Sequence, residues 1–469
     1  MKASAVCAIL SLSGVMVGAT HLSDSRLSKV YDVMNAISTH SWENGTKSEA
    51  ILEWTYPTLS VFTSTGNPFP GAGSITSGQI SQIIDIAQTT LQNRPASNTS
   101  AAARGGSSLL QDDAAGDPAS LGIAVLLANL TTGDAQVNGV GYGDAATQEL
   151  NYLLYDVPRV SGACDDEASC ELWLYYPPAS TNGTNGTSNA TLSAATTGAI
   201  SHRAQYAQLW SDSVFMVPPF LAAYGVWSAN QTLLQTAYTQ CALYRQYLRT
   251  SSGLWMHIVG SSSGLDYGLW ATGNAWAAYG MLRVWASIYH SPYRGEMGSQ
   301  MADLASWSGE IVQAAEQYIT SDGLFHNYIN DTSTFEDAAG AALMAATGLR
   351  LSTLNITNNY VPAALTLLSG VSDKVNSTGY LTQVVNPNSF GAQGTESPEG
   401  QSFVIMAYSA FKEWEQRGQS GFNGSGDPLG MGSAAGRRVG PVLGLGLESG
   451  WGWMLGLGVG LGGVLWAGL

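Results

Sequence analysis

The chain has 469 residues and a formal net charge of −16, because 34 Asp and Glu outnumber 18 Lys and Arg. Hydrophobic residues make up 45% of it, which suffices for a large core and excludes global disorder. The acidic balance excludes a nucleic-acid partner, which would need a basic stripe.

The first residues match a secretory signal peptide. Lys2 precedes an apolar run over residues 5–17, and the small residues Gly18 and Ala19 follow. A first core helix is the alternative, but the run is too short and too rich in Ser and Gly. We therefore expect residues 1–19 to be removed and the protein to be extracellular.

Apolar residues then recur at spacings of three and four, interrupted by Gly, Pro and Asn, which predicts helices. No segment alternates as a strand should. The predicted helices cover residues 24–40, 47–62, 77–92, 117–131, 143–156, 203–226, 230–249, 269–290, 298–320, 334–350, 360–369 and 399–417.

Twelve helices with short links predict six antiparallel hairpins and one all-α domain over residues 20–417. An (α/α)6 barrel, a six-hairpin toroid whose inner ring is wrapped by an outer ring, suits this length. A solenoid of helix pairs is the alternative, and the absence of a fixed-period repeat argues against it. Gly340 and Gly348 inside a predicted helix indicate close helix packing.

Glycosylation accounts for a surface with few charges, since charged residues are only 11% of the chain. Eleven N-x-S/T acceptors follow the predicted signal peptide, and several cluster in TNGTNGTSNAT, which indicates a glycosylated loop. The acceptors are Asn44, Asn98, Asn129, Asn182, Asn185, Asn189, Asn230, Asn330, Asn355, Asn376 and Asn423.

We interpret residues 162–196 as a polar insertion that forms a loop over one face of the domain. Cys164 and Cys170 fall inside it, in SGACDDEASCE, and an oxidising compartment favours a disulfide between them. Cys241 is then left as a buried free thiol. No Cys/His spacing indicates a zinc site, and we expect neither metal nor organic cofactor.

The C-terminus predicts a surface anchor. Residues 418–438 form a Gly/Ser-rich linker with small residues at 432–434, and an apolar tail over residues 439–469 has no charge after it. This pattern matches a glycosylphosphatidylinositol attachment signal, in which the tail is removed. A single-pass membrane anchor is the alternative, and residues 423–424 are further candidates for the attachment site.

The block ISHRAQYAQLWSDSVFMVPPFLAAYG carries the clearest candidate for an acid. It places His202, Arg203, Trp210 and Asp212 ahead of an apolar helix. Burial raises a carboxylate pKa, and a carboxyl that stays protonated can act as a general acid. The alternative for Asp212 is a helix N-cap.

A second block joins SSGLWMHIVG to LDYGLWATGNAWAAYGMLRVW. His257, Trp270, Asn274 and Trp276 surround a Gly turn that opens a helix. Aromatic faces with neighbouring polar groups are typical of a saccharide cleft, and aromatic core packing is the alternative.

Other carboxylates have simpler explanations. Asp112 and Asp113 are either catalytic acids or a solvated turn, and the turn is favoured. Others lie where predicted helices begin, and there the helix dipole favours a carboxylate whatever its function. They are Glu336, Asp337, Glu396 and Glu399.

In this order, the blocks resemble glycoside hydrolase family 88/105, the unsaturated uronyl hydrolases with a six-hairpin (α/α)6 barrel. The resemblance runs from Trp42 to Trp414 and is strongest in the two blocks above and in SPEGQSFVIMAYSAF. The opening SWENGTKSEAILEW resembles secreted fungal members.

The resemblance implies site residues. The family's acid/base aspartate falls on Asp212, and its upstream histidine on His202. The histidine before its Gly-Asn turn falls on His257, and its substrate-facing aromatic on Trp276, beside Asn274.

One position departs from the family pattern. The usual turn reads R-G-N-G-W, and here Thr272 replaces the arginine. Threonine cannot give a substrate carboxylate the paired hydrogen bonds of a guanidinium. Arg203 is a candidate to replace it, and altered or lost activity is an open alternative.

The family's activity would be release of 4,5-unsaturated uronyl residues that lyases leave on pectin-type oligosaccharides. One Asp protonates C4 of the enol ether, water adds at C5, and the hemiketal opens. A conventional cell-wall glycosidase is the second hypothesis and needs a partner acid such as Asp113 or Asp337. A wall-associated carbohydrate-binding protein without activity is the third. We expect a monomer that meets a membrane only through its C-terminal anchor.

Overall fold

The structure is a computed structural model. It describes residues 21–95, 105–133, 135–164, 170–175, 198–260 and 263–418, with the backbone alone for 161–164 and 170–175. All of these residues lie in the first of two compact units, Met1–Gly430. The predicted signal peptide, nearly all of the linker, the apolar tail and most of the insertion fall outside the described residues. In the described part, no helix is both long and apolar enough to cross a membrane.

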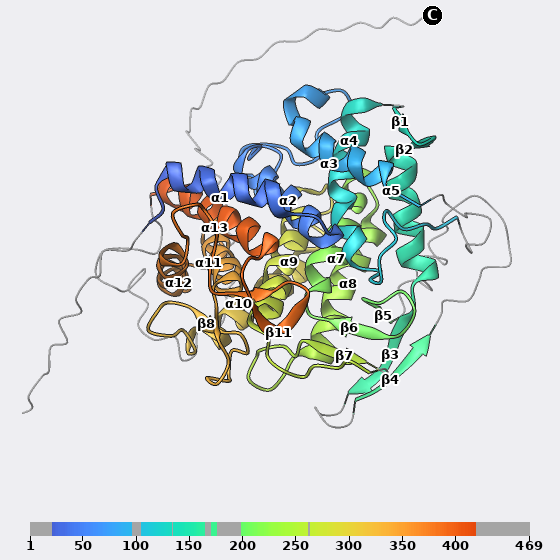
Figure 1. The fold of residues 1–469 in the computed structure, drawn as a ribbon. Coiled ribbons are helices and arrows are strands. Elements are labelled where there is room, and N and C mark those ends of the chain that lie inside the picture. Colours follow the sequence, from blue (N-terminus) through green and yellow to red (C-terminus); the bar gives the residue numbers. More distant parts are fainter. Residues whose placement is uncertain are drawn as a thin grey trace, which may run out of the picture. The chain divides into compact units, whose positions relative to one another are not determined.

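Twelve α-helices form most of the described part (Figure 1). They are α1 (Asp24–Ile37), α2 (Ser41–Trp54), α3 (Ser81–Gln92), α4 (Gly122–Thr132), α5 (Tyr142–Asn151), α7 (Ser213–Trp227), α8 (Gln231–Leu248), α9 (Ala271–His290), α10 (Gly298–Glu316), α11 (Ala338–Thr353), α12 (Val361–Asp373) and α13 (Pro398–Gln416).

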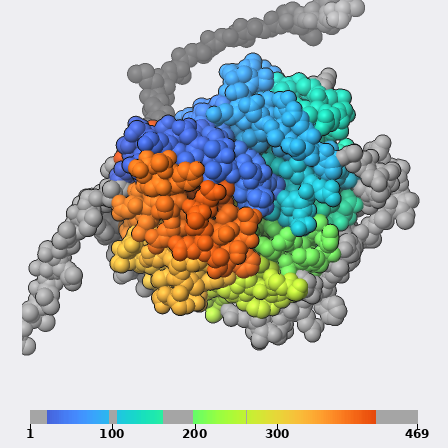
Figure 2. Space-filling view, in the orientation of Figure 1, coloured from blue at the N-terminus to red at the C-terminus, as the bar shows by residue number. Residues whose placement is uncertain are grey.

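Six helices form a closed inner ring. Its members, in order, are α2, α4, α7, α9, α11 and α13, and each contacts the next, with α13 returning to α2. The other six pack outside, each on an inner helix. Figure 2 shows the closure, where the N-terminal helices lie beside the C-terminal ones. The predicted (α/α)6 barrel is confirmed.

The inner helix α7 and the outer helix α3 differ in how much of their surface is buried. The inner helix α7 is apolar around its whole circumference, and every residue from Ser213 to Gly225 is buried. The outer helix α3 buries one stripe only, including Ile83, Ile86 and Leu91. Close packing at Gly340 is confirmed, because a Cβ there would lie 2.8 Å from the backbone nitrogen of Thr272 on α9.

The bounds of most predicted helices differ from the observed ones by a few residues, and two differ by more, including α2, which ends at Trp54 instead of 62. α2 begins at Ser41 instead of 47, because the Glu43 carboxylate accepts from the backbone nitrogen of His40 at 2.8 Å and caps the helix there. The first ten residues of the predicted helix 203–226 are not helical. Instead Gln208–Trp210 forms strand β6.

The expectation of no strands is wrong. Short antiparallel pairs connect the helices, and four of their strands, β6, β7, β9 and β11, precede inner helices. The strands are β1 (Gln136–Val137), β2 (Val140–Gly141), β3 (Arg159–Cys164), β4 (Cys170–Tyr175), β5 (Ala199–Ile200), β6 (Gln208–Trp210), β7 (Ile258–Gly260), β8 (Phe325–His326), β9 (Glu336–Asp337), β10 (Val384–Asn386) and β11 (Ser389–Gly394).

Part of the predicted insertion is a β-hairpin. β3 pairs with β4, and the register places Cys164 opposite Cys170. The side chains of these residues are outside the described part, so the disulfide stays a prediction. Cys241 is a buried free thiol, as predicted.

Candidate active site

A cavity of about 660 Å³ lies at the end of the barrel where the inner helices begin. Four of the six inner helices, α2, α7, α9 and α13, supply lining residues from their first two turns or from the residue just before them, and Asp117 comes from the segment that leads into α4. The β10–β11 hairpin adds Phe390. Six predicted site residues line this cavity: His202, Arg203, Trp210, Asp212, His257 and Trp276.

Asp212 lies directly before α7 and faces the cavity. It occupies the N-cap position, yet its side chain makes no capping hydrogen bond. Its Oδ1 atom has no hydrogen-bond partner among the described residues. Burial raises the pKa of Asp212, against the opposing effects of His257 and Arg203. The carboxyl is therefore free to exchange a proton with a ligand.

A second carboxyl, Asp117, shares the cavity, is more buried than the half-buried Asp212, and was missed in the sequence. It begins the short 3-10 helix η2 (Asp117–Leu121) that leads into α4. Burial raises its pKa well above the usual range, and Asp112 and Asp212 raise it further. In the sequence, Asp117 and Pro118 precede an apolar run. This pattern is typical of a helix start and is the signal that could have drawn attention to Asp117.

The two aspartates that the sequence singled out in this segment also line the cavity. Asp113 is exposed, as in a solvated turn. Asp112 is half-buried, and it accepts hydrogen bonds from the hydroxyl of Ser41 and from the backbone nitrogen of Ala114. The cavity thus contains a group of aspartates from one loop.

His202 and Arg203 surround Trp210. The ring of His202 stacks on that indole at 4.6 Å between centroids, and the guanidinium of Arg203 lies 4.5 Å from the indole centroid. The Nε2 atom of His202 is 3.8 Å from Oδ1 of Asp117. Burial, and next the charge of Arg203, hold the pKa of His202 well below its usual range, so this ring is neutral. Arg203 is then a fixed positive charge in the cavity wall.

His257 is oriented by Asp266, which sequence reasoning also missed. Nδ1 of His257 lies 2.9 Å from Oδ2 of Asp266, and that carboxylate also accepts from the Tyr328 hydroxyl at 2.8 Å and from the Gly268 nitrogen at 3.0 Å. Burial would raise the pKa of Asp266, but the hydrogen bond and charge of His257, followed by the other two donors, hold it below the usual value. No local pattern connects Asp266 to His257, because a loop brings them together.

Aromatic rings enclose His257. Trp270 lies at 4.4 Å and Phe390 at 4.5 Å between centroids. Trp276 lines the cavity deeper in the ring, between Phe215 of α7 at 4.4 Å and Phe403 of α13 at 4.6 Å. These rings supply flat apolar surfaces of the kind on which sugars stack.

Two predicted site residues, Thr272 and Asn274, lie away from the cavity. Both are fully buried in the first turn of α9. The Thr272 hydroxyl donates to Oδ2 of Asp337 at 2.6 Å, and the Asn274 amide bonds to both backbone groups of Trp255. Both side chains connect parts of the barrel.

Asp337 caps α11 as the helix-terminus interpretation predicts. Its carboxylate accepts from the backbone nitrogens of Ala339, Gly340 and Val385 as well as from Thr272. It is fully buried and does not line the cavity, so its position gives no support to a role as a partner acid.

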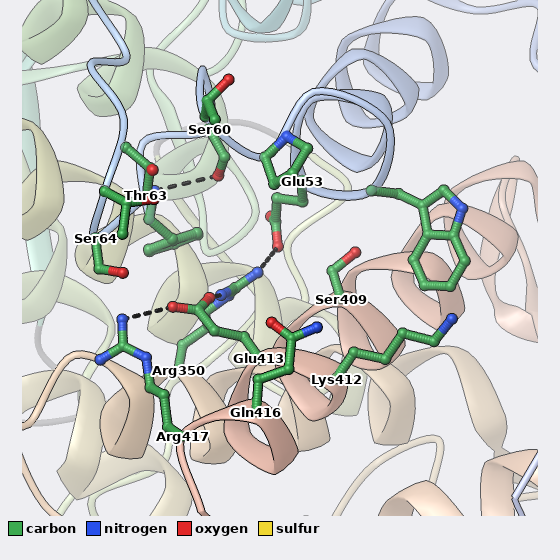
Figure 3. A pocket seen from close by; sticks show the side chains of 15 residues that line it. Glu53, Ser60, Thr63, Ser64, Arg350, Ser409, Lys412, Glu413, Gln416 and Arg417 are labelled. Carbon is green, nitrogen blue, oxygen red and sulfur yellow. Dashed lines mark hydrogen bonds and ion pairs between the residues drawn. The ribbon is translucent and has the colours of Figure 1, made fainter.

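A second cavity, of about 370 Å³, lies where α2, α11 and α13 end (Figure 3). Arg350 bonds there to Glu53 at 2.6 Å and to Glu413, and Arg417 bonds to Glu413 at 2.6 Å. Lys412 stacks over Trp54. Because these charges pair with one another, we assign the cluster to the stability of the barrel.

No group of three or more His, Cys, Asp or Glu side chains in the described ranges could hold a metal ion. The described active-site cavity therefore offers carboxyls, histidines, one arginine and aromatic rings.

Comparison with known proteins identifies related sequences and folds. Residues 188–410 match the family model described as Glycosyl Hydrolase Family 88. None of the curated proteins matches the chain. The matched range includes Arg203, Asp212, His257 and Trp276 but leaves out Asp117.

Solved structures share the fold at low identity. A possible member of the GH105 family from Klebsiella pneumoniae is 15% identical, with a TM-score of 0.58 over 87% of this chain and 99% of that one. One from Salmonella enterica is 14% identical, with a TM-score of 0.58 over 82% and 92%. Glycosyl hydrolase family 88 from Bacteroides vulgatus is 12% identical, with a TM-score of 0.54 over 82% and 97%. The chain thus matches the family 88 model over residues 188–410 and shares its barrel fold with these solved structures.

Proposed function

We propose that this protein is a glycoside hydrolase that releases 4,5-unsaturated uronyl residues from lyase-generated oligosaccharides of the pectin or rhamnogalacturonan type. The observation that carries the proposal is Asp212, a half-buried carboxyl that faces the cavity with one oxygen unpartnered among the described residues. A carboxyl with a raised pKa keeps its proton to a higher pH than an exposed aspartate and is suited to donate it.

The reaction needs one group that gives a proton and then accepts one. Asp212 donates its proton to C4 of the enol ether, and positive charge develops at C5 and the ring oxygen. The Asp212 carboxylate then takes a proton from water as that water adds to C5. The resulting hemiketal opens and releases the rest of the saccharide, so atoms and charge balance without a covalent intermediate.

Asp117 is a second protonatable carboxyl in the same site. Asp212 and Asp117 interact, and the charge of Asp212 raises the pKa of Asp117. Two carboxyls in one site do not both ionise readily, so the pair loses its protons in two separate steps.

The cavity wall contains groups that match the charge and the sugar rings of the proposed substrate. Arg203 is the fixed cation of the cavity and takes the place of the arginine that Thr272 replaces, binding the uronyl carboxylate. Trp210, Trp270 and Phe390 lie around His257, where a sugar ring can stack. The arrangement favours an anionic saccharide.

The test follows loss of the ultraviolet absorbance of the conjugated double bond when full-length protein meets lyase-generated unsaturated oligouronides. We expect turnover by the wild type and a loss of at least about 10³-fold in Asp212→Asn, within the range for removal of a general acid. Asp85→Asn, on the exposed side of α3, is the matched control. Flat wild-type traces across pectin- and glucuronan-derived substrates contradict the proposal.

A conventional glycosidase is the second candidate, favoured by the several carboxyls in the cavity. It needs two acids on either side of a glycosidic bond. Hydrolysis of a saturated oligosaccharide that is lost in both Asp212→Asn and Asp113→Asn would select it. Binding of saccharide without any product would select the binding protein.

We also propose that the protein is secreted, glycosylated and held at the cell surface by a glycosylphosphatidylinositol anchor. The signal-peptide pattern, the sequons and the apolar tail support this. Release from intact cells by phosphatidylinositol-specific phospholipase C is the expected result. If the protein stays on the cells after treatment with this phospholipase and only detergent releases it, the anchor spans the membrane.

A further inference from the structure

Glu399 is a buried carboxyl in the cavity wall that the reaction above does not use. It lies in the first turn of α13, is 4% exposed and lines the cavity. Its Oε2 atom has no hydrogen-bond partner among the described residues. A buried polar atom without a partner requires an explanation, since such atoms are rare in folded proteins.

Helix capping does not explain Glu399. The cap of α13 is Ser397, whose hydroxyl accepts from the backbone nitrogen of Gly400 at 3.0 Å. Glu396, three residues earlier, is exposed and lies outside the cavity. Glu396 and Glu399 therefore have opposite environments, because Glu396 is exposed and Glu399 is buried.

The ring order places Glu399 across the cavity from Asp212. α13 and α7 are separated by two inner helices on either side, so their first turns lie on opposite walls. Trp276 of α9 contacts Phe215 of α7 and Phe403 of α13, and it fills the space between the two helices deeper in the ring. A ligand on Trp276 is thus placed between the two carboxyls.

The groups around Glu399 oppose its ionisation. Burial raises the pKa of Glu399 to about 8, and the carboxylates of Glu43 on α2 and Asp337 ahead of α11 act in the same direction. A hydrogen bond from its own backbone nitrogen, and next one with Ser397, oppose them. The other charged or titratable groups of the cavity wall are His40, Asp112, Asp113, Asp117, His202, Arg203, Asp212 and His257.

We propose that Glu399 is a substrate-binding residue, which as a neutral acid donates a hydrogen bond from its buried carboxyl to a sugar oxygen on the wall opposite Asp212. This inference rests on the proposed function, because it concerns an anionic saccharide. An ionised Glu399 would lose the donor and repel the uronyl carboxylate. The neutral acid avoids both effects, so the residue makes binding depend on pH.

The experiment measures binding without turnover. Full-length Asp212→Asn is titrated calorimetrically with a lyase-generated unsaturated diuronide between pH 5 and 9.5. We expect Kd to rise about tenfold per pH unit once Glu399 ionises, as for a single proton. In Asp212→Asn/Glu399→Gln this rise disappears, since the amide keeps a donor and has no charge to gain. Asp212→Asn/Glu396→Gln is the matched control and retains the rise.

A third variant removes the hydrogen bond at every pH. Asp212→Asn/Glu399→Leu is expected to weaken binding at pH 5 about tenfold, as for loss of one hydrogen bond to a buried group. Thermal unfolding verifies that each variant is folded, and the Gln variant carries the test if the Leu variant is not.

Three results overturn the proposal for Glu399: an alkaline rise that persists in the Gln variant, unchanged affinity in a folded Leu variant, or loss of kcat with intact binding in Glu399→Gln alone. The last would make Glu399 an acid/base in the reaction. Failure of the proposed function looks different, because then the wild type turns over no unsaturated substrate and Asp212→Asn binds none at any pH.

Discussion

At the scale of single residues, the pair His257 and Asp266 shows how one carboxylate determines what a neighbouring ring presents to the cavity. Asp266 is held ionised by three donors, so it can only accept a hydrogen bond. Nδ1 of His257 therefore donates to Asp266, and Nε2 is left without a partner among the described residues.

We expect Asp266→Asn to lower kcat/KM on the unsaturated substrate at least about tenfold, because the amide can donate to Nδ1 and reverse the tautomer. Tyr328→Phe removes one donor but keeps the carboxylate, and it should cost only about two- to threefold, as for one weak hydrogen bond. The exposed Asp331→Asn is the control. Equal kcat/KM in Asp266→Asn and wild type would show that this carboxylate does not orient the ring.

At the scale of elements, the first turns of α9 and α11 are connected by the bond from Thr272 to Asp337. That aspartate also caps α11 and accepts from β10 through the nitrogen of Val385. One buried carboxylate thus holds together two inner helices and a hairpin that reaches the active-site cavity. The family arginine is replaced at a position that contributes to the framework of the site.

Thr272→Val tests this role. We expect the free energy of unfolding to fall by about 1.5–3 kcal/mol, the range for a hydrogen bond to a charged group, with KM within about twofold of wild type because Thr272 does not line the cavity. Thr347→Val is the control, since its hydroxyl bonds only to Leu343 on its own helix. Denaturant unfolding measures the free energy of unfolding, and initial rates measure KM. A KM increase larger than tenfold in folded Thr272→Val would return the residue to the substrate site.

Much of the fold could be predicted because inner and outer helices differ in their apolar periodicity, as α7 and α3 do. Asp212 could be predicted because its acid and its apolar helix are adjacent in sequence. Asp117 could not, since His202 and Asp212 come from other segments. Asp266 could not, since it lies nine positions after His257 with no recognisable pattern between them. Two-residue strands such as β8 leave no alternation to detect. Thr272 and Asn274 matched a family motif, but the motif gives no information about which way a side chain of α9 points.

At the scale of the whole molecule, buried carboxyls with raised pKa values recur through the barrel. Burial raises the pKa of Glu49 and Glu53 on α2, and it raises the pKa of Glu149 on α5 from 4.5 to about 7. Glu149 is fully buried and accepts from the backbone nitrogen of Leu109 at 2.6 Å. A group whose pKa is raised by folding stabilises the protein fully below its unfolded pKa, and this contribution is lost as the pH rises through the folded pKa.

We therefore expect the free energy of unfolding to fall as the pH rises from 4.5 past 7, with Glu149 alone contributing about 3 kcal/mol of that fall. Glu149→Gln keeps an acceptor for the backbone nitrogen of Leu109 and should remove the contribution of Glu149 to this fall. The exposed Glu296→Gln should leave the pH dependence unchanged. Urea unfolding at several pH values measures how the free energy of unfolding changes with pH. An equal change in wild type and Glu149→Gln would contradict the contribution assigned to Glu149.

The common direction of the inner helices affects how a substrate arrives. The chain carries a formal charge of −16, so an anionic saccharide is repelled at a distance, and dissolved salt screens that repulsion over about 10 Å at 0.1 M. Close to the cavity, four inner helices present their N-terminal ends, each equivalent to about half a positive charge, and salt reaches these buried groups far less. Moderate ionic strength should thus speed the capture of an acidic sugar while leaving its attraction inside the cavity nearly intact.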